Sequence, residues 1–151
     1  MFKKWNDWAP LPVRFVMGFS YIAAGFLKLF TGNGHHNFIY ELGHWGISGA
    51  LASTLTSFVG FLEFASGLLL VAGAYVTLVA IVQAVGTIGL LIAICIGGFP
   101  PAYDGLNYFP YCLPDVPYSW AIVAGLLTLL FGGAGKYSYD ALRKDPLRKS
   151  T

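Results

Sequence analysis

Four long apolar stretches constrain this chain more than any other feature of its sequence. A membrane-spanning helix needs about 20 mostly apolar residues to cross the hydrocarbon core of a bilayer. Stretches close to this length run from about 12 to 30, 52 to 72, 76 to 96 and 118 to 132. The composition agrees, since 56% of the residues are hydrophobic and 11% are charged, whereas soluble domains are about one quarter charged. We therefore predict an all-α membrane protein, a single four-transmembrane-helix bundle over residues 1–151.

Charge and cysteine content exclude several other classes of protein. The formal net charge of +2 is too small, and its charges too scattered, for a nucleic-acid-binding surface. Two cysteines cannot build a four-thiolate zinc site or a disulfide scaffold. The apolar content excludes an intrinsically disordered chain. We expect membrane lipids and other membrane subunits, or a second copy of the chain, as partners.

The distribution of positive charge predicts the orientation in the membrane. Eight of the nine Lys and Arg residues lie towards the two ends of the chain: Lys3, Lys4, Arg14, Lys136, Arg143, Lys144, Arg148 and Lys149. The long loops, at about 31–51 and 97–117, contain none. Because positive residues are retained on the cytoplasmic side, both termini, including a tail over 136–151, are predicted to be cytoplasmic. Both long loops then face outward.

Small residues predict where the helices pack together. Ala52, Thr56 and Gly60 repeat every four residues, and Ala121 and Gly125 have the same spacing. Small side chains at this spacing let helix backbones approach closely in lipid. Gly73, between the second and third stretches, is expected to end one helix in the left-handed conformation and start a tight hairpin. Arg14 is expected to extend towards lipid phosphate groups.

Polar residues at membrane depth are the main candidates for function, because ionisable groups are costly in a bilayer. Glu63 is about 16 Å along its predicted helix, whereas Lys28 lies in the last turn of the first helix. We predict a polar pocket for a quinone or lipid head group, formed by Lys28, Glu63, Gln83 and Thr87, with Glu63 as the candidate catalytic residue. The alternative is a polar cluster that only sets the helix register.

The outer loops carry two further sets of candidate residues. His35, His36 and His44 are weak metal-ligand candidates, but their spacing matches no strong metal site, and we predict none. Cys95 and Cys112 are both expected on the oxidising side, where they either form a disulfide or stay as two free thiols.

Motifs in a consistent order point to a known family. The first helix contains Arg14-Phe-Val-Met-Gly18 and then Gly25-Phe-Leu-Lys28. The second contains Glu63-Phe-Ala-Ser-Gly67, followed by a Leu-rich run to Gly73. The chain closes with Gly133-Ala-Gly-Lys-Tyr-Ser-Tyr-Asp140. Together with the loop from Phe38 to Ser48, these motifs resemble the DoxX family of small four-helix membrane proteins over residues 11–142.

The resemblance implies a protein of the bacterial plasma (inner) membrane and a link to redox metabolism. Some family members resemble membrane subunits of thiosulfate:quinone oxidoreductases. We therefore expect a non-catalytic integral membrane subunit of a respiratory or redox complex, with no covalently bound cofactor. The alternatives are a stand-alone thiosulfate:quinone-type oxidoreductase, with Glu63 handling quinone protons, and a purely structural accessory subunit. Fold analogy alone does not choose among them.

Overall fold

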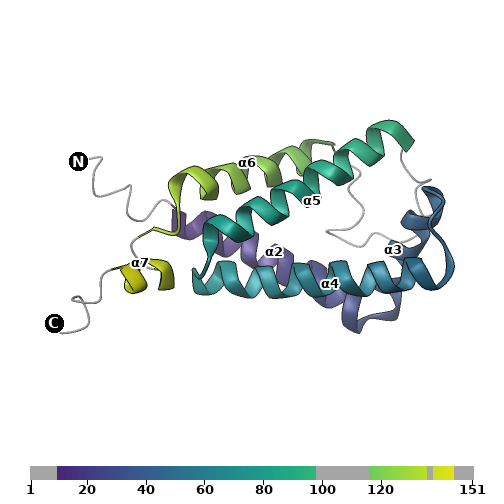
Figure 1. Ribbon diagram of the computed structural model, residues 1–151, viewed down its shortest axis with the longest axis horizontal. Coiled ribbons are helices and arrows are strands. Elements are labelled where there is room, and N and C mark those ends of the chain that lie inside the picture. Colours follow the sequence, from purple (N-terminus) through teal and green to yellow (C-terminus); the bar gives the residue numbers. More distant parts are fainter. Residues whose placement is uncertain (1–9, 98–115, 136–137, 145–151) are drawn as a thin grey trace.

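The computed structural model describes residues 10–97, 116–135 and 138–144, and this part of the chain forms helices and no strands (Figure 1). The helices are α2 (Pro10–Phe30), α3 (Gly32–His44), α4 (Gly49–Ala72), α5 (Val76–Gly97), α6 (Val116–Gly132) and α7 (Tyr139–Lys144). The prediction of an all-α protein is confirmed for these residues.

Helices α2 and α4 are long and apolar enough to cross a membrane. They contain 21 and 24 residues. The apolar parts of α5 and α6 that the structure describes are shorter, Val76–Ile92 and Ala121–Gly132. Each of the four helices lies over one of the apolar stretches in the sequence.

The four long helices lie side by side as two pairs (Figure 1). Helix α2 packs along α4, and α5 packs along α6. Helix α3 joins α2 to α4 at one end of the bundle, whereas α7 lies at the opposite end, near the start of α2 (Figure 1). The two ends of the molecule are therefore built from different parts of the chain.

Glycines allow the close approach of α2 and α4. A β-carbon at Gly67 would lie 2.6 Å from the carbonyl oxygen of Gly18. One at Gly60 would lie 2.9 Å from Lys28 Cβ. Ala52 and Thr56, on the predicted stripe of small residues, have no exposed surface. The predicted packing of this stripe is confirmed.

The prediction that the second pair of small residues packs against a neighbouring helix is confirmed for Gly125 and wrong for Ala121. A β-carbon at Gly125 would lie 3.0 Å from Met17 Sδ, so Gly125 does face α2. Ala121 is exposed.

The apolar core lies towards the end of the bundle that carries α7. It consists of buried residues from all four long helices: Met17, Tyr21, Leu70, Val76, Val79, Ala80, Leu126 and Leu129. These positions fall early in α2 and α5 and late in α4 and α6. Apolar packing therefore joins the two helix pairs near this end.

The turn between α4 and α5 is held by the C-terminal helix α7. Gly73 has φ 71°, and its N–H donates to the carbonyl of Leu70, which confirms the predicted helix stop. The Asp140 carboxylate accepts from the N–H groups of Tyr75 and Val76 at 2.9 and 3.0 Å. A carboxylate at the start of a helix satisfies N–H groups that have no partner within the helix. Asp140 therefore caps α5 from a distant part of the chain.

The expectation that Arg14 extends to lipid head groups is wrong. Its side chain is buried, with the residue 2% exposed. Its Nη1 donates to the carbonyl oxygen of Ala134 at 2.6 Å, and the guanidinium also attracts Asp140. The chain after α6 folds back over the start of α2 and offers Arg14 these nearer partners.

The loop between the first two apolar stretches contains a helix of 13 residues, α3. Thr31 precedes it in an extended conformation, and its hydroxyl accepts from the Gly34 N–H at 3.3 Å. This is the usual way in which a threonine starts a helix. The second long loop lies mostly outside the described residues.

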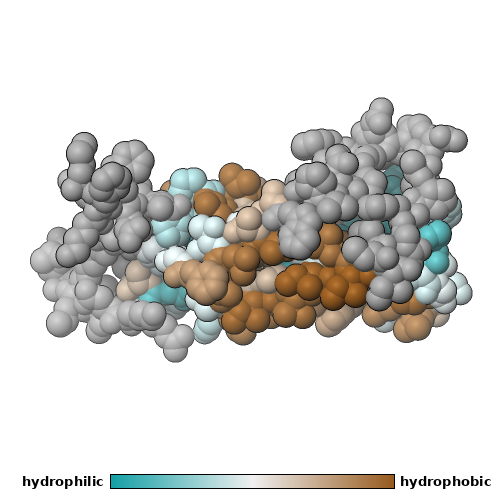
Figure 2. Space-filling model, turned by 90° about the horizontal axis from the view of Figure 1, so that it is seen from above, coloured by the Kyte–Doolittle hydropathy of each residue, from teal (hydrophilic) through white to brown (hydrophobic). Residues whose placement is uncertain are grey.

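The surface of the described helices is largely apolar. Figure 2 shows a brown band along the middle of the molecule and more hydrophilic colours around α3. Phe19, Phe58, Phe61, Val85 and Phe131 are each more than half exposed. An apolar band of this kind suits the hydrocarbon core of a bilayer.

Candidate functional site: a buried ion pair beneath helix α3

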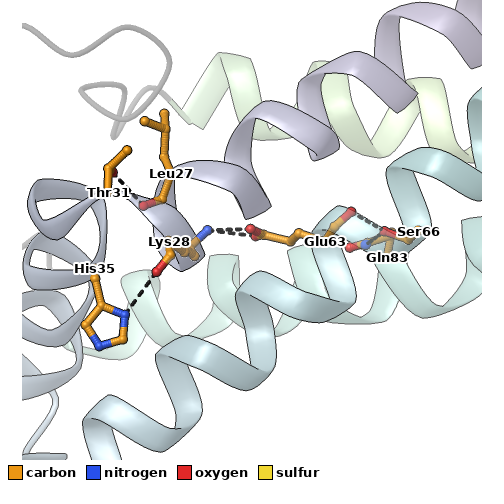
Figure 3. A network of polar contacts seen from close by, with 7 residues as sticks. All are labelled: Leu27, Lys28, Thr31, His35, Glu63, Ser66 and Gln83. Atoms are coloured by element: carbon orange, nitrogen blue, oxygen red, sulfur yellow. Dashed lines mark hydrogen bonds and ion pairs between the residues drawn. The ribbon is translucent and has the colours of Figure 1, made fainter.

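Lys28 and Glu63 form an ion pair between α2 and α4 (Figure 3). Lys28 Nζ lies 2.8 Å from Glu63 Oε1 and 2.7 Å from Oε2. The lysine side chain is 7% exposed and the glutamate side chain 17%. Lys28 therefore points along the bundle towards the glutamate, not outward to the lipid head groups.

The local sequence explains why these two groups meet. Gly60 lies one helical turn before Glu63, and a β-carbon there would lie only 2.9 Å from Lys28 Cβ, so the glycine lets the two backbones come close together. Lys28 is in the last turn of α2, and its flexible chain of four methylene groups spans the remaining distance. A buried ion pair of this kind costs about 3–5 kcal/mol when one partner is removed, because the other charge is left uncompensated.

A second polar contact joins α4 to α5 beside the ion pair. Gln83 Nε2 donates to Ser66 Oγ, and Ser66 Oγ donates to the carbonyl oxygen of Glu63 at 2.9 Å (Figure 3). Both side chains are buried. Gln83 thus reaches the ion pair through Ser66 and the backbone of Glu63.

The predicted pocket residues differ in what they do. Lys28 and Glu63 form the pair, Gln83 reaches it indirectly, and the Thr87 hydroxyl donates to the carbonyl of Gln83 at 2.9 Å, within its own helix. Ser66 is absent from the predicted set, although it follows Glu63 by three residues and so lies on a neighbouring helix position.

Helix α3 covers the lysine end of the pair. His35 Nδ1 lies 3.0 Å from the Lys28 carbonyl oxygen, and Nε2 lies 3.2 Å from Ser53 Oγ. Because a carbonyl only accepts, Nδ1 must carry the proton of a neutral His35 and Nε2 accepts from Ser53. The centroid of the Phe38 ring lies 4.8 Å from Lys28 Nζ, within range of a cation–π contact.

Glu41, on the same helix, interacts electrostatically with the pair. Burial raises the pKa of its carboxyl to about 6, attraction to Lys28 lowers it, and repulsion from Glu63 raises it. The Lys28 ammonium is therefore influenced by two carboxyl groups, one from α4 and one from α3. Nothing in the local sequence pattern around Glu41 links it to Lys28.

The histidines do not gather into a metal site in the described part of the chain. His35 uses both ring nitrogens in the contacts above, and His36 and His44 are exposed. Among the described residues, no three His, Cys, Asp or Glu side chains come together.

The cysteines lie at the edge of the described structure or beyond it. Cys95 belongs to α5, in a stretch whose side chains are not described, and Cys112 lies outside the described residues. A disulfide between them stays a prediction.

A shallow, open groove runs beside His35 at the junction of α2 and α3. It is lined by Leu29, Phe30, Thr31, Gly32, His35, His36 and Ile39. The groove combines an apolar rim with an imidazole that contacts the backbone of Lys28.

Comparison with protein families identifies the chain. The family model described as DoxX matches residues 9–95. The chain belongs to the DoxX family. The matched part of this DoxX protein runs from α2 almost to the end of α5, so it contains Lys28, Glu63, Ser66 and Gln83. Neither a curated protein nor a solved structure matches the chain significantly.

Membership and structure together identify a membrane protein of the DoxX family. The family match agrees with the apolar lengths of α2 and α4, which by themselves would also fit the core helices of a soluble protein. In this DoxX protein, the Lys28–Glu63 pair is the largest concentration of charge within the two spanning helices, which otherwise contain Arg14 as their charged residue.

Proposed function

We propose that this DoxX protein is an integral subunit of a membrane redox complex, and that the Lys28–Glu63 pair binds the polar head group of a quinone or lipid. The observation that carries the proposal is the buried ammonium–carboxylate pair, with both carboxylate oxygens within 2.8 Å of Nζ. Ionisable groups at membrane depth are expensive and usually serve a function.

The chemistry of the pair suits a quinone head group. A quinone carbonyl accepts hydrogen bonds, which an ammonium group donates, and a quinol hydroxyl donates to a carboxylate. Glu63 keeps 17% of its side chain exposed, so the described helices do not enclose it completely. A bound quinone would supply two-electron redox chemistry, whereas the role of this chain is to bind and orient the head group.

Other subunits are proposed to carry the metal or flavin centres of the complex. The described helices gather polar groups for hydrogen bonding and charge pairing, and they hold no cluster of metal-ligating side chains in the residues that the structure describes. The proposed role is that of an accessory subunit, with lipids and larger membrane subunits, or a second copy of the chain, as partners.

We further propose four membrane spans with both termini in the cytoplasm of a bacterial cell. With four spans, both ends of the chain lie on the same side of the membrane. The charge distribution favours the cytoplasm for that side, since eight of nine Lys and Arg residues lie towards the chain ends. Helix α3 would then lie at the outer surface, and α7 at the cytoplasmic surface.

A structural role is the second candidate function. The same ion pair ties α2 to α4, and buried polar contacts in membrane proteins can fix helix register without binding a ligand. A stand-alone thiosulfate:quinone-type oxidoreductase would need sulfur chemistry, for which Cys95 and Cys112 are the sequence candidates.

The deciding experiment is gentle extraction from native membranes followed by mass spectrometry of co-purifying proteins and lipids, quinones included. We expect a stoichiometric complex with cofactor-bearing subunits, and bound quinone in the wild type that is at least tenfold lower in Glu63→Gln. Ser57→Ala is the matched control, because Ser57 is an exposed residue of the same helix. Quinone retained by Glu63→Gln, with assembly alone impaired, would establish the structural role instead.

A further inference from the structure

Two residues of helix α3 contact Lys28. His35 binds the Lys28 carbonyl, and the Phe38 ring faces the Lys28 ammonium. Glu41 follows Phe38 by three residues, and residues three apart are neighbours on a helix surface. The side of α3 that faces Lys28 therefore also carries the Glu41 carboxyl group.

Three charged groups from three helices interact here. The Glu63 carboxylate binds Lys28 directly, and Glu41 is attracted by Lys28 and repelled by Glu63. Among the described residues of the helices that pack on α3, these are the titratable groups that act on Glu41: Lys28 from α2 and Glu63 from α4. On α3 itself, His36, Tyr40 and His44 are exposed, whereas His35 is held by Lys28 and Ser53.

One ammonium cannot neutralise two carboxylates. If both Glu41 and Glu63 are ionised, the three groups carry a net charge of −1 in a poorly solvated place. Binding one proton makes the set neutral. Because Glu63 is the carboxylate that binds Lys28 through both oxygens, Glu41 is the group that takes the proton, which agrees with its raised pKa of about 6.

We propose that Glu41 exchanges protons between the outer aqueous phase and the Lys28–Glu63 pair. This proposal rests on the proposed function of the pair as a head-group site and on α3 facing outward. A hydronium ion of the outer aqueous phase protonates the Glu41 carboxylate and becomes water. When the Lys28 ammonium moves from Glu63 towards Glu41, the Glu41 O–H bond breaks and an O–H bond forms on Glu63. One proton is transferred, and no group is oxidised or reduced.

The chain offers an unusually clean test, because Glu41 and Glu63 are its two glutamates. Protein labelled with ¹³C-glutamate and placed in lipid nanodiscs would show these two carboxyl groups apart from all aspartates in an infrared titration. We expect a labelled carboxyl band that appears as the pH falls through about 6. It should be lost in Glu41→Gln.

The Glu63→Gln variant tests whether the titration of Glu41 is coupled to the Lys28–Glu63 pair. This change removes the repelling charge and leaves Lys28 to attract Glu41, so the midpoint of the Glu41 band should fall from about 6 towards the ordinary glutamate value of about 4.3. The control Ser57→Ala should leave the midpoint in place. A midpoint that Glu63→Gln does not move would overturn the proposal, because Glu41 would then titrate independently.

A second measurement separates this proposal from the proposed function. Binding of a short-chain ubiquinone to the nanodiscs is measured across the same pH range. We expect the wild type to change its affinity at least threefold across pH 6 and Glu41→Gln to show a flat profile. Identical profiles for the two proteins would contradict proton exchange through Glu41. If neither protein binds quinone at any pH, the proposed head-group site fails, and the infrared coupling alone decides the role of Glu41.

Discussion

Lys28 is the one lysine between residues 5 and 135, and its position in the last turn of α2 could serve the surface or the interior equally well. At the end of a membrane helix a lysine usually extends to the head groups. Here the side chain turns back along the bundle to Glu63, because Gly60 leaves room for it and the carboxylate offers two acceptors. The pairing thus depends on a neighbouring small residue as much as on opposite charge.

A double-mutant cycle on this pair is the most direct test at the residue scale. Lys28→Met and Glu63→Met should each destabilise the protein by about 3–5 kcal/mol, because each leaves one buried charge without a partner. The double variant should be more stable than either single variant. Unfolding by sodium dodecyl sulfate in mixed micelles measures all three, and strictly additive losses would show that the pair does not form.

How much of this site the sequence predicts differs from residue to residue. Both charged residues stand out, because they interrupt apolar stretches. Ser66 does not, since a serine in a membrane helix is unremarkable in sequence, and its contact with Gln83 depends on how α4 and α5 are rotated. His35 is recognisable in the sequence as a metal-capable residue, but the contact of its side chain with the backbone carbonyl of Lys28 follows from the folding of α3 against α2.

At the scale of elements, α2 and α4 form the closest helix pair, and glycine makes that closeness possible. A β-carbon at Gly67 would lie 2.6 Å from both the Gly18 carbonyl oxygen and the Ile22 nitrogen. Backbone atoms cannot move aside as a flexible side chain can, so a methyl group at this position forces the two helices apart.

Gly67→Ala should therefore destabilise the protein by about 1–3 kcal/mol, the usual cost of overpacking. The matched control is Gly86→Ala on α5, where an added β-carbon meets no atom within 4 Å. That control should be neutral or slightly stabilising, because alanine favours a helix over glycine. Thermal unfolding in detergent measures both variants, and equal effects would argue against close α2–α4 packing.

The cap supplied by Asp140 gives a second prediction about elements. Asp140→Ala removes the acceptor of two N–H groups at the start of α5 and should cost about 0.5–2 kcal/mol, the usual worth of a helix cap. Asp140→Asn should restore part of the loss, since an amide oxygen still accepts. Hydrogen exchange at Tyr75 and Val76 should be faster in the alanine variant. Unchanged exchange there would contradict a capping role.

At the scale of the whole molecule, the arrangement of the helices predicts that the two ends of the bundle, with α3 and α7, lie on opposite sides of the membrane. Exposed His44 lies on α3 at one end, and exposed Tyr139 lies on α7 at the other (Figure 1). The four long helices between them run the length of the bundle. When the four long helices cross the membrane, these two residues therefore lie on opposite sides of it.

Labelling intact cells tests this topology. In a background of Cys95→Ser and Cys112→Ser, His44→Cys should react with a membrane-impermeant maleimide, whereas Tyr139→Cys should react only after the cells are opened. The physical reason is that the positive residues are retained in the cytoplasm on the side of α7. Labelling of Tyr139→Cys in intact cells, with His44→Cys protected, would reverse the orientation that we propose.

The sequence by itself determined the helices and their place in a membrane protein. Apolar stretches of this length admit few structures, because backbone groups in lipid must be satisfied within a helix or a closed barrel. Small residues at regular spacing and Gly73 likewise act locally, so their roles can be predicted.

The tertiary structure decided which polar groups meet. Lys28 and Glu63 are 35 residues apart, Asp140 and Val76 are 64 apart, and Arg14 and Ala134 are 120 apart. Contacts over such separations depend on the rotation and crossing of whole helices, and a pattern of nearby residues does not determine these. The burial of Arg14 under the chain that follows α6, and the position of α3 over Lys28, come from this packing.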